Sequence, residues 1–248
     1  MTDSHAHLDA LDDPDAAVAR ARDAGVTRIV TIGTGVDSCR RALAIAERQE
    51  GVVAVLGIDP HQASGAEAGR LGEVRELLSH PQAVAVGETG LDGFHRHAEP
   101  ADQQRLFEAH LALAEELGKP VVIHCREAAR ETAVTLQGFS GTVVLHCFSE
   151  PELLAPALEH GWYVSFAGNV TYPRSAELRE LVVRVPAARV LAETDSPYLA
   201  PQGLRGRPNE PAHVVHTLRV LAKARGEEPE ELGHRVDANA TAAFGLAS

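Results

Sequence analysis

The sequence has little of several features that mark particular protein classes. Of its 248 residues only three are cysteine, an odd number too small for a disulfide framework. No apolar run approaches the ~18 residues that a membrane-spanning helix needs, which predicts no membrane partner. The first 13 residues are acidic and lack the basic and then apolar order of a signal peptide, so we expect a cytoplasmic protein.

Positive charge and aromatic residues are also scarce. The chain has 23 Lys and Arg against 35 Asp and Glu, a formal net charge of -12. This balance argues against a protein that coats duplex nucleic acid, because such binding depends on basic residues that displace counterions. It does not exclude a nuclease, since divalent cations held by acidic residues make a site locally positive. Aromatic residues are 4% of the chain, so few surfaces for base stacking are available.

Short apolar, β-branched runs alternate with longer alanine-rich amphipathic segments along the chain. The predicted strands are residues 28–32, 52–57, 83–87, 121–124, 142–146, 162–166 and 189–193. The predicted helices are 14–24, 37–50, 66–79, 101–117, 127–137, 150–160 and 175–185, with further helices from residue 211 onward. Such alternation is typical of parallel strands joined by right-handed crossovers.

With residues 1–4 as a short first strand, the strand count reaches eight. We therefore predict one domain over residues 1–248, a single (β/α)8 TIM-type barrel of the metal-dependent hydrolase kind. The alternative is a doubly wound open sheet, which usually has a Gly-rich phosphate loop after its first strand. This chain has Ser4-His5-Ala6-His7 at that point, which favours the barrel.

Metal-binding side chains recur where the predicted strands end. His5 and His7 are two residues apart, so in a strand both imidazoles point the same way. The other members of this set follow or end later strands and are Glu88, His124, His146 and Asp195. The His5/His7 pair alone is as readily structural as metal-binding, and a single histidine such as His124 or His146 is more often structural than a ligand. Their joint placement at one rim of a barrel predicts bound divalent cations, with Zn, Mn and Mg left open.

Two neighbouring cations need an anionic bridge, which in some barrel hydrolases is a carbamylated lysine. Lys119 and Lys223 are the only lysines; the first begins a strand and the second lies in a late helix, so neither is suitably placed. Glu88 is therefore the candidate bridge, at the end of its strand before a Gly-rich turn. A water shared by two cations has a lowered pKa, and we predict that Asp195 accepts its proton during catalysis.

His95 and His97 form a second His-x-His pair, in the segment 92–100. Neighbouring Asp, Arg and Glu residues favour a solvated loop, so we predict no metal there.

Six motifs, in this order along the chain, resemble the TatD family of metal-dependent deoxyribonucleases. They are Asp3-Ser4-His5-Ala6-His7-Leu8-Asp9, Gly57-Ile58-Asp59-Pro60-His61, Gly87-Glu88-Thr89-Gly90-Leu91-Asp92, Val122-Ile123-His124-Cys125-Arg126, His146-Cys147-Phe148-Ser149 and Glu193-Thr194-Asp195-Ser196-Pro197-Tyr198-Leu199. Asn209-Glu210-Pro211 and the C-terminal stretch to Gly245 also look like this family, so the resemblance runs end to end.

The resemblance implies an amidohydrolase-type barrel whose metal ligands match the six residues above, with Glu88 as the bridge. His61 matches a histidine thought to meet a substrate phosphate. We add Arg126 and Arg207 as phosphate contacts, because a guanidinium fits phosphate oxygens and both lie in loops. Asp59 departs from the family, which often has His there, and an acid near the phosphate could repel substrate. Gly93 also departs, since the family often has an aromatic residue there.

These observations predict an enzyme that hydrolyses phosphodiester bonds in DNA with two divalent metal ions. We expect an exonuclease that acts on single-stranded ends, and a monomer. Two other functions stay open. The same ligands would serve a metal-dependent amidase or lactonase, and the barrel could be an inactive, metal-free scaffold.

Overall fold

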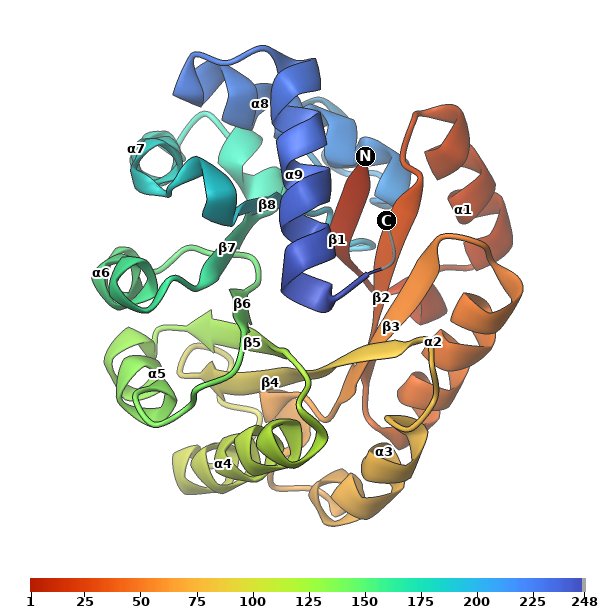
Figure 1. Cartoon of the computed structure of the whole chain (residues 1–248), viewed down its shortest axis with the longest axis vertical. Helices are drawn as coiled ribbons and strands as arrows, with labels where there is room; N and C mark the ends of the chain where they lie inside the picture. Colours follow the sequence, from red (N-terminus) through yellow and green to blue (C-terminus); the bar gives the residue numbers. More distant parts are fainter. Residues whose placement is uncertain (247–248) are drawn as a thin grey trace.

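Eight parallel strands surrounded by helices make up the computed structural model, which describes residues 1–246 (Figure 1). The strands are β1 (Thr2–Ala6), β2 (Arg28–Thr34), β3 (Val52–Gly57), β4 (Ala83–Asp92), β5 (Val121–Arg126), β6 (Val143–Leu145), β7 (Tyr163–Phe166) and β8 (Val190–Ala192). Each strand pairs in parallel with the next in the chain. The predicted barrel is therefore confirmed.

The helices are α1 (Pro14–Asp23), α2 (Val36–Arg48), α3 (Leu71–Leu77), α4 (Pro100–Leu117), α5 (Ala129–Leu136), α6 (Pro151–His160), α7 (Ala176–Arg184), α8 (Val214–Arg225) and α9 (Pro229–Phe244). Proline occupies the first turn of α1, α4, α6 and α9, where its missing N–H and fixed φ suit a helix start. Asp13 also caps α1, since its carboxylate accepts the N–H of Ala16 at 2.9 Å.

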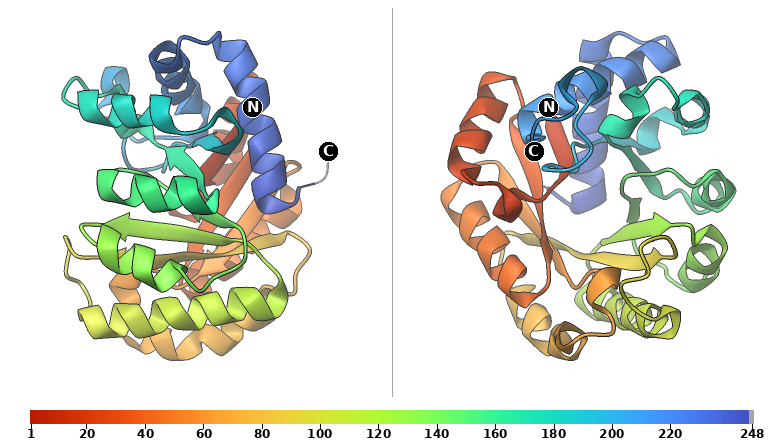
Figure 2. Two further views of the ribbon diagram at one scale, coloured as in Figure 1. Left: turned by 60° about the vertical axis from the view of Figure 1, so that its left-hand side comes forward. Right: turned by 180° about the vertical axis from the view of Figure 1, so that it is seen from behind.

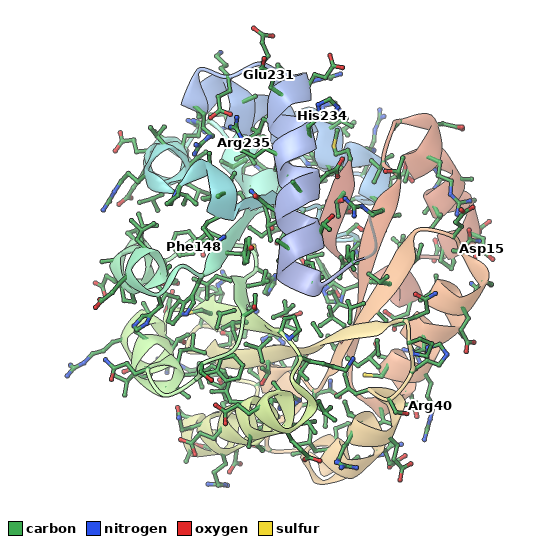
Figure 3. The ribbon with its side chains drawn as sticks, in the orientation of Figure 1. Asp15, Arg40, Phe148, Glu231, His234 and Arg235 are labelled. Carbon is green, nitrogen blue, oxygen red and sulfur yellow. The ribbon has the colours of Figure 1, made fainter. Side chains whose placement is uncertain are left out.

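The helices α1 to α8 form an outer ring, as the two views of Figure 2 show from the side and from behind. Their outward faces carry charged side chains such as Asp15 and Arg40 (Figure 3), each about half exposed. Their inward faces pack on the strands and form the larger apolar core. Within residues 1–246, none of the helices combines the length and apolar character needed to cross a membrane.

Helix α9 closes one end of the barrel (Figure 1). Its Ala240, Ala243 and Phe244 pack against inward-pointing residues of the strands, among them Val30 and Leu191. This end is the one where the strands begin, because Asp237 accepts the hydroxyl of Thr2 and Asn239 donates to the carbonyl of Val190. The opposite end, where the strands finish, is not covered by α9, and this is the end at which barrels of this type carry their functional sites.

Candidate metal centre

All six predicted metal ligands meet at the C-terminal mouth of the barrel. His5 lies in β1, Glu88 in β4 and His124 in β5. His7 and His146 directly follow β1 and β6, and Asp195 lies three residues after the end of β8. All are buried except His124, which is partly exposed.

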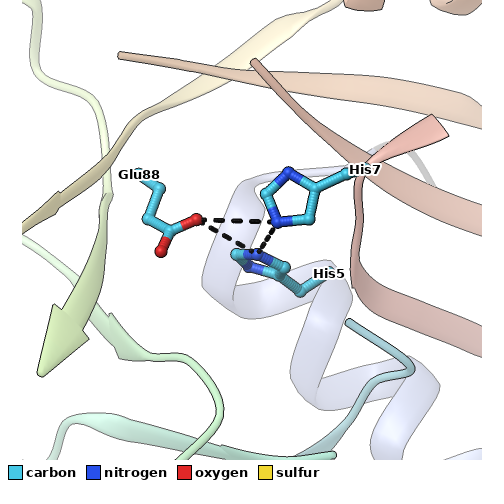
Figure 4. Close-up of side chains that lie close together, drawn as sticks. All are labelled: His5, His7 and Glu88. Atoms are coloured by element: carbon cyan, nitrogen blue, oxygen red, sulfur yellow. Dashed lines mark hydrogen bonds and ion pairs between the residues drawn. The ribbon is translucent and has the colours of Figure 1, made fainter. Parts of the chain in front are cut away.

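The first group of ligand atoms forms at the junction between β1 and β8, with Glu88 reaching it from β4. The Nε2 atoms of His5 and His7 lie 3.3 Å apart. Oδ1 of Asp195 is 3.4 Å from Nε2 of His7, and Oε2 of Glu88 is 3.4 Å from Nε2 of His5 (Figure 4). The backbone fixes this junction, because the N–H of Asp195 donates to the carbonyl of His5 at 2.9 Å.

The second group comes from β5 and β6. Nδ1 of His124 and Nε2 of His146 each lie 2.9 Å from Oε1 of Glu88. The two nitrogen atoms are 3.2 Å apart. Glu88 therefore points one carboxylate oxygen at each group.

The position of Glu88 depends on a bulge in β4. Val86 pairs with Val121, but Thr89 pairs with Ile123, so β4 has one extra residue in this interval. A bulge of this kind turns a side chain that regular pleating would place elsewhere. Gly87 and Gly90 permit it with φ of 139° and 137°, and a Cβ on either would lie within 2.6 Å of a β5 carbonyl oxygen.

The strand therefore runs on to Asp92, and the prediction that it ends near Glu88 and gives way to a turn over residues 89–93 is wrong. The reason is that the two glycines keep β4 paired with β5, whereas Gly-rich sequence was interpreted as the end of the strand.

The carboxylates of this centre are ionised. Burial alone would raise the pKa of Glu88, but the charge of His146 and hydrogen bonds from the surrounding imidazoles hold that pKa well below its usual range. Burial likewise opposes ionisation of Asp195, whose pKa is lowered by the imidazoles of His7 and His5.

The donor set fits divalent cations. Oδ1 of Asp195 is buried and has no hydrogen-bond partner within residues 1–246, although a buried charged oxygen is costly unless it is paired or coordinates a metal. In each group two imidazole nitrogens and a carboxylate oxygen lie within 4.8 Å of one another. Imidazole with carboxylate is a ligand set that zinc and similar cations bind.

Two acidic residues behind the ligands were not assigned a role from the sequence. Glu193 is fully buried, its Oε1 accepts the N–H of Cys147 at 2.7 Å, and the same oxygen lies 3.5 Å from Nδ1 of His146. Oδ2 of Asp92 lies 3.0 Å from Nε2 of His124. The Asp92 carboxylate is within hydrogen-bond distance of His124 and can fix the tautomer of that imidazole, whereas Glu193 lies close to His146 without a hydrogen bond to it. Both acids lie within the family motifs quoted above, and this position was the one feature of the sequence that pointed to a role for them.

A cleft of about 980 Å³ opens over the centre. His61 and Arg126, both predicted to contact substrate, line it. The guanidinium of Arg126 stacks 3.9 Å above the ring of Phe94, which is 50% exposed. Arg207 is exposed and is not among the residues that line the cleft, so the structure does not bring it to the centre.

Several known proteins are similar to this chain in sequence and in fold. The family model described as TatD related DNase matches residues 2–245. A Mycobacterium tuberculosis protein named "Uncharacterized metal-dependent hydrolase TatD" is 39% identical over 99% of this chain and 98% of its own. The Escherichia coli protein named "3'-5' ssDNA/RNA exonuclease TatD" is 37% identical over 95% of this chain and 94% of its own. The crystal structure of YjjV, a TatD homologue from Escherichia coli, superposes with a TM-score of 0.94 at 30% identity, covering 100% of this chain and 98% of that one.

Proposed function

The chain belongs to the family of TatD-related DNases, and from this membership we propose that it is an exonuclease that shortens single-stranded DNA from its ends. It is a metal-dependent hydrolase of phosphodiester bonds, as the family and its curated relatives are. The direction of attack, the strandedness of the substrate, the number of metal ions and the roles of single residues are the finer parts of the proposal.

The position of Glu88 carries the proposal. Its Oε2 faces His5 and His7 while its Oε1 faces His124 and His146, so a single carboxylate can bridge two cations. His5, His7 and Asp195 would hold the first cation and His124 with His146 the second. Zn, Mn and Mg remain the candidates, and the imidazole-rich donor set favours the first two.

The residues around the two proposed cations have separate roles in hydrolysis. When bound, the cations supply a lowered pKa for the attacking water and offset the charge on the phosphoryl group. Asp195 accepts the proton of the attacking water, because Glu88 is engaged on both sides. His61 and Arg126 bind the non-bridging phosphate oxygens from the cleft wall. Arg207 contacts the DNA strand outside the cleft.

Two exposed aromatic residues, Tyr198 in the cleft and Phe94 beside its lining residue Arg126, support a single-stranded substrate. Phe94 carries the guanidinium of Arg126 on its ring, and Tyr198, at 58% exposure, lines the cleft near His7. Unpaired bases stack on such rings, whereas a duplex keeps its bases covered. The name of the Escherichia coli relative supports attack in the 3'-5' direction and adds RNA as a second substrate. The monomeric state and cytoplasmic location remain predictions.

The proposal is tested with end-labelled oligonucleotides. Protein stripped by chelator is supplied with Zn²⁺, Mn²⁺ or Mg²⁺ and given single-stranded DNA, duplex DNA, RNA, and a panel of esters and amides. We expect a metal-dependent ladder that shortens single strands from the 3' end. Turnover of the ester or amide panel without cleavage of any oligonucleotide would contradict it and favour carbonyl chemistry.

A further inference from the structure

A second cluster of histidines surrounds Asp92, beside the metal centre. Oδ2 of Asp92 lies 2.9 Å from Nε2 of His61, 2.8 Å from Nδ1 of His95 and 3.0 Å from Nε2 of His124. The Asp92 side chain has no exposed area, whereas His61 and His95 are 31% and 36% exposed. His97 stacks on His95 with ring centroids 5.6 Å apart.

Hydrogen bonding alone does not account for three imidazoles on one oxygen. Oδ1 of Asp92 already accepts the backbone N–H groups of Phe94 and His95, at 2.9 Å and 2.7 Å. A carboxylate offers about four acceptor positions, two on each oxygen, so Oδ2 has about two left for three nitrogens. The three imidazole nitrogens therefore exceed the remaining acceptor positions of Oδ2 by one.

A cation between His61, His95 and Asp92 removes the excess. One acceptor position of Oδ2 then takes the Nε2–H of His124, and the other binds the cation together with the lone pairs of His61 and His95. The three atoms lie within 4.8 Å of one another, as ligands of one ion must. His124 keeps its Nδ1 lone pair for the metal centre, because its proton is on Nε2.

The surroundings of His61 support the same arrangement. Its Nδ1, the nitrogen that faces away from the cluster, lies 3.9 Å from Oδ2 of Asp59. This distance is too long for a hydrogen bond, but the nearby carboxylate adds negative charge that favours a cation at the cluster. Asp59 is the residue whose charge was expected to repel a phosphate, and a cation on the other side of His61 would offset that charge.

We propose that His61, Asp92 and His95 form a third divalent-cation site, separate from the six ligands of the metal centre. Two imidazoles and one carboxylate suit Zn²⁺ and leave at least one coordination position for a ligand from solution. His61 and His95 both line the cleft, so that position is open to substrate. If the proposed nuclease function holds, the ligand is a phosphate oxygen, and His61 meets the phosphate through the cation.

Zinc content tests the site without any measurement of activity. The full-length protein, His95→Ala and His97→Ala are stripped, equilibrated with Zn²⁺ and measured for zinc per chain. His97→Ala is the matched control, because this neighbouring histidine in the same loop does not belong to the ligand set. We expect His95→Ala to bind about one Zn²⁺ fewer than the wild type, and His97→Ala to match the wild type. Anomalous diffraction from Zn²⁺-soaked crystals should place an ion about 2.0–2.2 Å from the three ligand atoms.

Equal zinc contents in all three proteins, or an anomalous map without a peak beside Asp92, would overturn the site. Loss of zinc from His97→Ala as well would overturn the assignment of His95 as a ligand. For the substrate step we expect His95→Ala to raise KM for a single-stranded oligonucleotide about tenfold with little change in kcat. If neither the wild type nor the two variants cleave nucleic acid, the proposed function fails. The difference in zinc content between these proteins still shows whether the third site exists.

Discussion

Acid should destabilise this fold through one buried histidine outside the metal centre. His110 lies in α4 and is fully buried. Its Nδ1–H donates to the carbonyl of Leu106 at 2.8 Å, and its Nε2 accepts the N–H of Ile58 at 3.0 Å. The ring therefore acts as donor at one nitrogen and acceptor at the other, which only the neutral form can do. Burial lowers the pKa of His110 from 6.5 to about 4.

The direction and size of the effect follow from that pKa. Because the unfolded chain binds the proton more readily than the folded protein, the contribution of His110 to stability is complete above pH 6.5 and is lost as the pH falls toward 4. Between pH 7.5 and pH 5 the free energy of unfolding should fall by about 2 kcal/mol from this residue alone.

Urea denaturation of the wild type and His110→Gln isolates this contribution. Glutamine offers an oxygen to the N–H of Ile58 but does not titrate, and the other histidines contribute equally to both proteins. With metals removed by chelator, the stability advantage of the wild type over His110→Gln should shrink by about 2 kcal/mol between pH 7.5 and pH 5. An advantage that stays constant over this range would refute the assignment of the pH dependence to His110.

Three further predictions concern the metal centre. Glu88→Ala should lose most activity and metal while its urea midpoint without metal barely changes; wild-type turnover at saturating metal would exclude the bridge. Asp195→Asn should lower kcat on an oligonucleotide by about 10² to 10⁴, and full kcat with confirmed metal occupancy would move the base elsewhere. Glu193→Gln should weaken metal affinity about 10- to 100-fold through His146, measured by competition with a chelating dye; unchanged affinity would show that Glu193 does not support that ligand.

The sequence was sufficient to predict the barrel and to select six side chains that meet at its mouth, because both depend on local pattern. Alternating apolar runs and amphipathic segments report strands and helices, and parallel pairing of successive strands brings every strand end to the same rim. His5 and His7 share a direction because they are two residues apart. The family motifs add the order of the ligands but not their geometry.

Only the tertiary structure decided how side chains from different strands meet. The bulge at Gly87 and Glu88 arises from pairing with β5, so the sequence of β4 alone could not show that Glu88 faces both groups. The convergence of His61, His95 and His124 on Asp92 joins three segments far apart in the chain, and the path of a long loop leaves Arg207 outside the cleft. Periodicity specifies which face of an element is buried, whereas contacts between elements depend on register and loop path, which are set when the whole barrel packs.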